Sequence, residues 1–600
     1  MRWRDLIICS LCTIVAAGGF IIAGMRLDYI SSQRREMKLI SNEPLKNAPP
    51  SLAFATVAMG AFRGLVVDVL WMRAERLKEE GEFFDAKQLA DWITTLQPRF
   101  AQVWQWQAWN MAYNISVCFP ATQPQQRWRW VKNGYELLRD QGIAINPESS
   151  SLYFQLGMIF QHKIGSESDD VHKYYKLQLA EEMEALLGPA TESYFDALAD
   201  VTWDWRQIAE SNDVGAFVGA LRAADENFAD ADGDAFVKNY MSLRQNPHRF
   251  DVAAFNVIDR FRTSQALEKF DIFAKAYILR NVWKLEPGLM RQLNKTYGPV
   301  NWNDPNNRLP LDWRHADCHA IYWGYMGLQQ ITRDPARTVG MDETNIDRLI
   351  LNSLQALFRY GKTFIFEVRQ PASDTLSQES AEGGDTVVGP MEKDIFLRPD
   401  LRMFESYNQA TLKVLEKYKN NRKVGYEAIQ IGHRNMLINA AFSFYQGGLQ
   451  RQAVRIYNQL RQLYPMDEFK VSLTQFIRDR LKEELQNLSE KDAREMIEML
   501  LQESYFRYAF RDDNEAFSRE KMAQEIYDRY QTTNTEQKRL EMPDFRMLRY
   551  FALLGFLNDA QYPVQLQRDL LSRIEIERPQ LAEQLKQQQQ QLLKQLKPTQ

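Results

Sequence analysis

Apolar residues recur along the chain at the spacing of paired helices, and this pattern is strongest over residues 62–117. Counting back from Pro98 as the last residue of a repeat of about 34 residues places Gly81 at the turn between two helices. Ala74 and Ala86 then fall where the two helices must touch, because helix axes about 8–10 Å apart leave no room for longer side chains. This is tetratricopeptide spacing, and it predicts an antiparallel helix pair.

The same pattern continues into a second and a third repeat. Trp104 and Ala108 keep the register of the second, which the polar stretch 118–126 interrupts before a further helix ends at Pro147. The third repeats the expected order of aromatic, Leu, Gly and aromatic residues: Tyr153, Leu156, Gly157 and Phe160. A single helix pair cannot bury both of its apolar stripes, so the repeats should stack. Residues 51–190 are therefore predicted to be N-terminal tetratricopeptide-like helical repeats.

Helical periodicity persists through a central region, residues 191–362, without a regular repeat length. The repeat spacing returns in residues 401–580. Counting back from Pro465 there places seven residues at the small, aromatic and turn positions: Leu437, Ala441, Phe444, Gly448, Ala453, Tyr457 and Leu460. The last residues, 581–600, are rich in Gln and lack the apolar pattern of a globular core. We expect a solvated helical tail there, with a partner-bound helix as the alternative.

The chain begins with an uncharged apolar run from Leu6 to Met25, which is 20 residues long. At about 1.5 Å per residue, a helix of this length matches a hydrocarbon core of about 30 Å. We predict a membrane anchor in residues 1–30, followed by a linker in residues 31–50. A cleaved signal peptide is the alternative, but the run is long for such a peptide, and the following GMRLDY has no clear cleavage site.

Two observations disagree on which side of the membrane the body of the protein lies. Arg2 and Arg4 precede the apolar run, whereas four basic residues follow it, and this excess favours a cytoplasmic body: Arg26, Arg34, Arg35 and Lys38. A tail of only five residues before the run is instead typical of an anchor that leaves the N-terminus inside and exports the rest. We expect the body to lie outside the cytoplasm.

A second apolar run, in residues 51–72, is long enough for another crossing, which would reverse that side. Arg63 and Asp68 argue against a crossing, because each costs about 2.5–3.5 kcal/mol at the centre of a membrane helix. We expect instead a buried opening helix of the repeat body, with Ser51 as its N-cap. The crossing remains the alternative.

One short region, residues 363–400, alternates apolar and polar residues as β-strands do. The segments TFIFEVR and DTVVGPMEKDIFL flank a polar, glycine-containing loop around residues 371–384. We interpret the region as a β-hairpin inserted in a helical body. The predicted fold class is therefore all-α: a tetratricopeptide-like α-solenoid with an N-terminal transmembrane helix and a small β-hairpin insertion.

Composition narrows the function without indicating a reaction. The chain has 600 residues, 45% of them hydrophobic, and a net charge of −4, so we expect a globular protein without nucleic acid as a partner. Cys118 and Cys318 are the only cysteines outside the first apolar run, which argues against a disulfide framework. Phosphate-binding glycine loops, dinucleotide fingerprints and hydrolase motifs do not occur in a usable context. We predict no cofactor, no metal and no catalytic residue, and lean against an enzyme.

Two segments resemble metal sites without completing one. The stretch DADGDAF lacks two oxygen ligands that a calcium loop needs. His315 and His319 lie one helical turn apart, a spacing that metal ligands use, but no third ligand can be assigned. We expect both histidines to be packed structurally. The alternative is that Asp312, Trp313 and the two histidines line a cleft in an envelope enzyme or a carbohydrate-binding receptor.

Residues 62–117, together with the stretch PLDWRHADCHAIYW at residues 310–323, carry a resemblance to a known group of proteins. They resemble a bacterial family of membrane-anchored, tetratricopeptide-like helical-repeat proteins that has no assigned function. The resemblance implies a bacterial inner-membrane protein with a single membrane helix. It implies no activity.

Tetratricopeptide domains in general bind partner segments on the concave face that the first helices of the repeats form. Transferred residue by residue, the resemblance implies a partner-binding face of six residues: Gln105, Trp109, Tyr113, Phe154, Gln161 and His162. The alternative is that neighbouring helices of the same chain cover this face. We therefore expect a membrane-tethered helical-repeat scaffold for protein–protein interaction, as an accessory subunit of an envelope transport, secretion or assembly complex.

Overall fold

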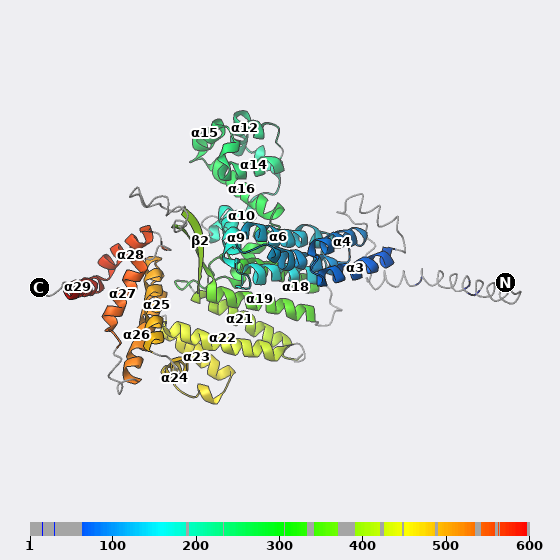
Figure 1. The fold of residues 1–600 in the computed structure, drawn as a ribbon. Helices are drawn as coiled ribbons and strands as arrows, with labels where there is room; N and C mark the ends of the chain where they lie inside the picture. The colour runs from blue at the N-terminus through cyan, green and yellow to red at the C-terminus, as the bar shows by residue number, and fades with distance from the viewer. Residues whose placement is uncertain are drawn as a thin grey trace, which may run out of the picture. The chain divides into compact units, whose positions relative to one another are not determined.

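The computed structural model is mostly helical, which confirms the predicted all-α class (Figure 1). Apart from Val15, Gly18 and Tyr29, it describes residues 63–187, 191–231, 233–304, 307–332, 341–369, 391–420, 425–446, 449–485, 490–533, 542–558, 562 and 564–596. The predicted membrane helix therefore lies outside the described residues except at Val15 and Gly18. The loop at 371–384 lies outside them entirely. Within the described part of the chain, no helix combines the length and apolar content that a membrane crossing needs.

The first of two compact units, residues 1–103 and 144–146, contains the helix pair that the spacing predicts. Its helices α3 (Arg63–Glu79) and α4 (Phe83–Leu96) meet at Gly81, whose φ of 84° lies in the left-handed region that glycine adopts without steric penalty. Ala74 and Ala86 are completely buried, as the close approach of the two helices requires. This predicted pair is confirmed.

Much of α3 is exposed, so the expectation of a buried opening helix is wrong for this part of the run. Leu65, Val69 and Met72 are 60–65% exposed. The reason is that α3 carries apolar residues around its circumference, whereas α4 packs along one side of it. Residues 51–62, with the predicted cap Ser51, lie outside the described residues.

The second compact unit takes in the rest of the chain and begins with helices that contain π-helical turns. Helix α5 (Ala101–Trp109) continues into the π-helical η2 (Asn110–Ile115), and α6 (Pro124–Glu136) continues into the π-helical η4 (Leu137–Gly142). A Cβ at Gly134 would lie 2.9 Å from a backbone oxygen of α5. Glycine at this position therefore lets α6 approach the backbone of its partner.

The helix that packs along α8 comes from much later in the chain. Helix α8 (Ser150–Met158) and its π-helical continuation η5 (Ile159–Ile164) lie against α18 (Ala316–Thr332). The rings of Tyr153 and Trp323, one from each helix, have centroids 6.3 Å apart. The aromatic, Leu, Gly, aromatic pattern of the third repeat is buried as predicted, but its main partner is not the next helix.

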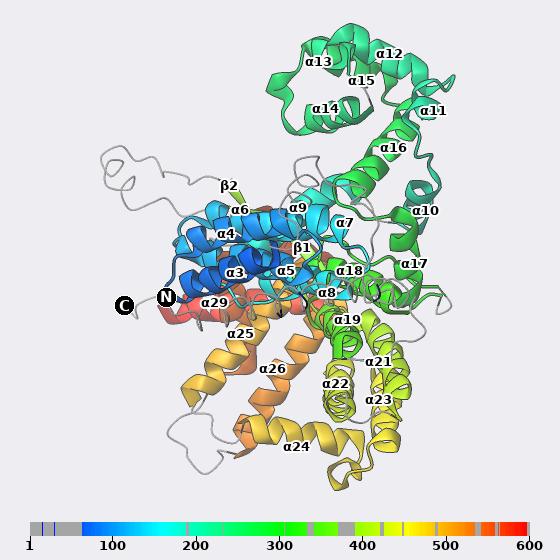
Figure 2. The same ribbon diagram turned by 90° about the vertical axis from the view of Figure 1, so that its right-hand side faces the viewer.

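The chain between α8 and α18 forms nine further α-helices among the described residues (Figure 2). Several of them surround a separate core rich in aromatic residues, in which Phe270 is fully buried and its ring centroid lies 4.9 Å from that of Tyr240. The bounds of these helices are α9 His172–Leu187, α10 Glu192–Asp200, α11 Trp205–Ala209, α12 Val214–Ala224, α13 Glu226–Ala229, α14 Gly233–Gln245, α15 Val252–Phe261, α16 Gln265–Asn281 and α17 Pro287–Tyr297.

After α18, helices that follow one another in sequence pack side by side. They are α19 (Met341–Tyr360), α21 (Phe404–Tyr418), α22 (Tyr426–Gln446) and α23 (Gln450–Leu463). The residues at the predicted contact positions of α22 and α23 are all buried: Leu437, Ala441, Phe444, Ala453, Tyr457 and Leu460. The predicted C-terminal helix pair is therefore confirmed, while its predicted turn residue, Gly448, lies outside the described residues.

The predicted β-hairpin is present between α19 and α21. Strand β1 (Lys362–Arg369) pairs antiparallel with β2 (Met391–Arg398) over eight residue pairs, from Lys362 opposite Arg398 to Arg369 opposite Met391. Ile395 on β2 is buried, and the ring of Phe364 on β1 lies 5.2 Å from that of Phe510. Because Ile395 pairs with Ile365, the neighbour of Phe364, these two side chains lie on opposite faces of the hairpin, so each face carries a packed apolar side chain.

Six α-helices follow α23 in the described part of the chain, and the last five of them surround another apolar core. Their bounds are α24 Leu473–Leu485, α25 Glu490–Ala509, α26 Asp513–Thr533, α27 Phe545–Asn558, α28 Val564–Glu577 and α29 Pro579–Leu596. The Gln-rich tail is helical as expected as far as it is described, to Leu596, but it is not free of the core. Leu581 and Leu585 at its start are 6% and 7% exposed and pack with α27 and α28. These two leucines, one turn apart, supply the apolar stripe that the Gln-rich composition obscures.

Candidate binding cavity

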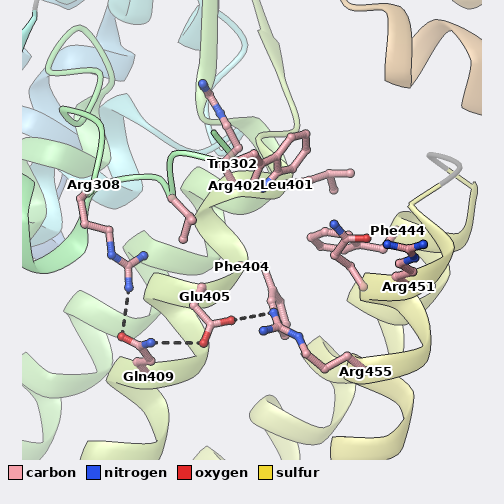
Figure 3. A pocket seen from close by; sticks show the side chains of 12 residues that line it. Trp302, Arg308, Leu401, Arg402, Phe404, Glu405, Gln409, Phe444, Arg451 and Arg455 are labelled. Carbon is pink, nitrogen blue, oxygen red and sulfur yellow. Dashed lines mark hydrogen bonds and ion pairs between the residues drawn. The ribbon is translucent and has the colours of Figure 1, made fainter. Parts of the chain in front are cut away.

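A cavity of about 490 Å³ lies between the loop that follows α17, the short helix η7 (Leu401–Met403) and helices α21, α22 and α23 (Figure 3). Its lining combines arginines, aromatic rings and aliphatic side chains: Val300, Trp302, Arg308, Leu401, Arg402, Phe404, Glu405, Gln409, Phe444, Arg451, Gln452 and Arg455. They come from three separate stretches of the sequence.

The loop that forms one wall is held in place by backbone hydrogen bonds. Helix α17 ends before Gly298, and the chain returns through a β-bridge between Val300 and Arg308. The amide of Val300 also donates to the carbonyl of Arg402 at 3.0 Å, which ties the loop to η7. A Cβ at Gly298 would overlap the backbone oxygen of Leu309, so only glycine permits this return.

Aromatic and aliphatic side chains form the apolar part of the lining. Phe404 and Phe444 meet edge to face with ring centroids 5.8 Å apart, and both are almost fully buried. Leu401 is 4% exposed beside them, whereas Trp302 on the loop remains 41% exposed. The cavity therefore has a fixed apolar base and an exposed indole at its edge.

Polar side chains form a chain of hydrogen bonds along α21 (Figure 3). Arg455 pairs with Glu405 at 3.1 Å, and the other carboxylate oxygen of Glu405 accepts from Gln409 Nε2 at 3.2 Å. The amide oxygen of Gln409 accepts in turn from Arg308 Nη2 at 3.0 Å. Glu405 is thus already occupied by a cation and an amide, and it offers little free negative charge to a ligand.

The arginines of the cavity outnumber its carboxylates. Arg402 is paired with Asp400 at 2.7 Å behind the cavity wall, as Arg455 is with Glu405. The remaining hydrogen bonds of Arg308 go to neutral oxygens, Ser406 Oγ at 2.7 Å and the carbonyl of Gly298 at 3.3 Å. Burial lowers the pKa of Arg308 from its usual value, with Glu405 opposing the shift, but a guanidinium remains charged at neutral pH.

Arg451, at the start of α23, is exposed and has no hydrogen-bond or ion-pair partner among the residues that the structure describes. Together with Arg308, it gives the cavity two guanidinium groups that form no ion pair with a carboxylate of the described residues. Such groups bind carboxylates or phosphates through charge-assisted hydrogen bonds. The cavity is therefore an electropositive site with an apolar base.

The predicted partner-binding face is only partly free. Trp109 stacks on Tyr113, with ring centroids 3.8 Å apart, and the hydroxyl of Tyr113 lies 3.3 Å from His162 Nδ1, so these three residues form one cluster. Gln105 instead donates to Ser151 Oγ at 2.6 Å. Gln161 donates to the carbonyl of Leu349 and to Ser353 Oγ on α19, and Phe154 is half-buried on α8. Helices of the same chain therefore occupy part of this face.

The Trp/His segment is packed into the core and does not line an open cleft. Trp313, His315 and His319 are at most 3% exposed, and His319 Nε2 lies 3.0 Å from the carbonyl oxygen of Trp313. Burial lowers the pKa of both histidines to about 4, so both are neutral at pH 7. Asp312 instead lines a separate cavity of about 230 Å³, where it pairs with Arg314. No group of three or more metal-ligating side chains occurs in the described ranges.

Sequence reasoning did not single out the cavity arginines. Arg451 and Arg455 are one helical turn apart, which places two cations on one face of α23. That spacing was available as a signal, although it is as common on solvated helix faces. Arg308 carries no comparable signal, because its approach to α21 depends on the loop after Gly298.

Comparison with known proteins does not extend these observations, because no family model and no curated protein matches the chain.

Proposed function

We propose that the chain is a membrane-tethered, tetratricopeptide-like α-solenoid that binds partner proteins, as an accessory subunit of an envelope transport, secretion or assembly complex. The observation that carries this proposal is the open, electropositive cavity on α21, α22 and α23, where Arg451 has no hydrogen-bond or ion-pair partner in the part of the chain that the structure describes. Its position on helices that pack in sequence order fits a repeat protein, which uses the surface of stacked helices for recognition.

Two features support the tether. The uncharged run from Leu6 to Met25 has the length of a membrane helix. Leu65, Val69 and Met72 on α3 expose apolar surface close behind it in the sequence, where lipid would cover them. Attachment of this kind raises the local concentration of the binding surface for partners in the same membrane. We place the anchor in the bacterial inner membrane and the body outside the cytoplasm.

The test is recovery of partners from native membranes after detergent solubilisation, with the full-length chain as bait. Arg451→Glu reverses the charge of the unpaired arginine and should lose a stoichiometric partner that the unchanged chain recovers. Arg461→Glu is the matched control, because Arg461 lies exposed on the same helix and does not line the cavity. Failure of the unchanged chain to recover any stoichiometric partner would refute the scaffold, and equal recovery by both variants would refute the cavity as its site.

A further inference from the structure

The two arginines without an ion pair among the described residues, Arg308 and Arg451, lie on opposite sides of the cavity. Arg308 belongs to the loop after α17 and Arg451 to the first turn of α23, and Figure 3 places Phe404 and Glu405 between them. Arg308 is half-buried and held by neutral oxygens, so its guanidinium is fixed in position before a ligand arrives. Arg451 is exposed and unrestrained. A ligand with two separated negative groups could reach both.

The surface near these cations is apolar. Leu401, Phe404 and Phe444 are buried at the base, and the indole of Trp302 stands exposed at the edge. A bare anion such as phosphate would leave this base in contact with water, whereas an apolar side chain would cover it. The volume of about 490 Å³ falls in the range of about 300–1,000 Å³ that ligand pockets occupy, which leaves room for a few side chains.

The same cavity disfavours basic ligands. Glu405 is the one acidic residue among the described residues that line it, and Arg455 and Gln409 already bind both of its oxygens. A lysine or arginine of a ligand would meet guanidinium groups without finding a free carboxylate. Discrimination by repulsion of this kind contributes to specificity as much as the attractive contacts do.

We infer that the cavity recognises an acidic peptide segment in which two carboxylates flank an apolar or aromatic side chain. The carboxylates bind Arg308 and Arg451, and the apolar side chain covers the base formed by Phe404 and Phe444. This inference rests on the proposed function, since it names the chemistry of the partner segment that the scaffold would receive.

The binding test uses the full-length chain in detergent and a fluorescein-labelled peptide, Glu-Glu-Phe-Leu-Glu-Glu, followed by fluorescence anisotropy. Its counterpart Gln-Gln-Phe-Leu-Gln-Gln has the same length without charge and should bind about tenfold more weakly or worse, because it loses charge-assisted hydrogen bonds. Arg451→Gln should weaken binding of the acidic peptide by a similar factor, and Arg461→Gln should leave it unchanged. Added salt should weaken binding to the unchanged chain and have less effect on Arg451→Gln.

Equal binding of the acidic and the neutral peptide would overturn the inference, as would full binding by Arg451→Gln. Displacement of the peptide by inorganic phosphate at equal concentration would assign the site to a small anion instead. Binding of phosphatidylglycerol vesicles that depends on Arg451, without peptide binding, would assign it to a lipid headgroup. Thermal unfolding of each variant excludes misfolding as the cause of a loss.

The peptide result and the membrane pull-down can fail separately. If native partners depend on Arg451 but the acidic peptide does not bind, the proposed function stands and the ligand chemistry is wrong. If the unchanged chain recovers no partner, the scaffold fails, and the peptide then reports a binding site with another role.

Discussion

Replacing Asp169 with Asn should destabilise the N-terminal part of the second compact unit more than any nearby surface change. The carboxylate is 1% exposed and accepts from two cations, Arg127 at 2.9 Å and Lys163 at 2.5 Å. It also accepts from the amide of Val171 at 3.1 Å and from the hydroxyl of Tyr175 at 3.3 Å. These contacts join α6, η5 and the start of α9 through one side chain.

Asn keeps the shape of Asp169 but removes the charge that compensates two buried cations. The side chains of Arg127 and Lys163 are 9% and 4% exposed, so water cannot replace the lost partner. Breaking a buried ion pair in this way costs about 3–5 kcal/mol. We expect the lower part of that range. Burial already lowers the pKa of Lys163 although Asp169 opposes the shift, so in the variant the Lys163 ammonium can lose its proton and avoid an uncompensated charge.

The measurement is amide hydrogen exchange of the full-length chain, read in peptides that cover residues 124–187. A loss of about 3–4 kcal/mol in local stability, the lower part of that range, should accelerate exchange there about 10²- to 10³-fold, since each 1.4 kcal/mol is tenfold. Asp170→Asn is the matched control, because the Asp170 side chain is 78% exposed and its carboxylate lies 3.9 Å from Arg127, a longer contact than that of Asp169. A surface pair of this kind contributes at most about 1 kcal/mol. Equal acceleration by the two variants would refute the argument.

The effect of Asp169→Asn should also depend on pH in a definite direction. Burial opposes ionisation of Asp169, but the hydrogen bonds from Lys163 and Val171 outweigh it and lower the pKa of the carboxyl below its usual value. A depressed carboxyl pKa contributes stability above the unfolded pKa, and this contribution is lost as pH falls through the folded pKa. The difference between the unchanged chain and Asp169→Asn should therefore be full at neutral pH and shrink only under strongly acidic conditions.

Three further predictions concern other parts of the chain. Phe270→Ala should lower the free energy of unfolding by about 3–5 kcal/mol, because it leaves a cavity in the aromatic core of α12–α16. Hydrogen exchange in these helices should become faster, and Phe270→Leu should have a smaller effect. Gly298→Ala should displace the cavity loop and abolish binding of the acidic peptide, whereas Gly219→Ala, which meets open space, should bind it normally. Burial raises the pKa of Asp317 to about 7, so the folded state favours the protonated carboxyl and loses stability as pH rises through 7. Asp317→Asn should remove this loss, which a comparison of thermal unfolding at pH 5 and pH 8 measures.

Local sequence patterns gave the most accurate predictions where a helix packs against the helix next to it in sequence. Ala74, Gly81 and Ala86 have the burial and backbone geometry that repeat spacing predicts, as do Ala441 and Ala453 in the C-terminal pair. The predictions hold because a small residue at a helix contact and a glycine at a tight turn are required by geometry within some 30 residues. The membrane anchor, the solenoid and the partner-binding face remain predictions.

Local patterns failed where one element meets another from far along the chain. Periodicity correctly predicted the buried face of α8, but the helix that covers this face is α18. The segment between α8 and α18 in the sequence includes the separate core around Phe270. The same limit hid the cavity, whose residues come from the loop after α17, from η7 with α21, and from α22 with α23. Likewise the exposure of apolar side chains on α3 could not be predicted, because the hydrophobicity of a helix does not show which of its sides another helix covers.

By itself the sequence determined that the chain is helical, where its close helix pairs lie, and where a β-hairpin interrupts them. These features follow from side-chain spacing and turn chemistry, which act over short distances along the chain. Only the tertiary structure decided which helices meet and which arginines remain without a carboxylate. Charge pairing depends on distances of a few ångströms between residues such as Glu405 and Arg455, which lie 50 positions apart, and no local pattern records such distances.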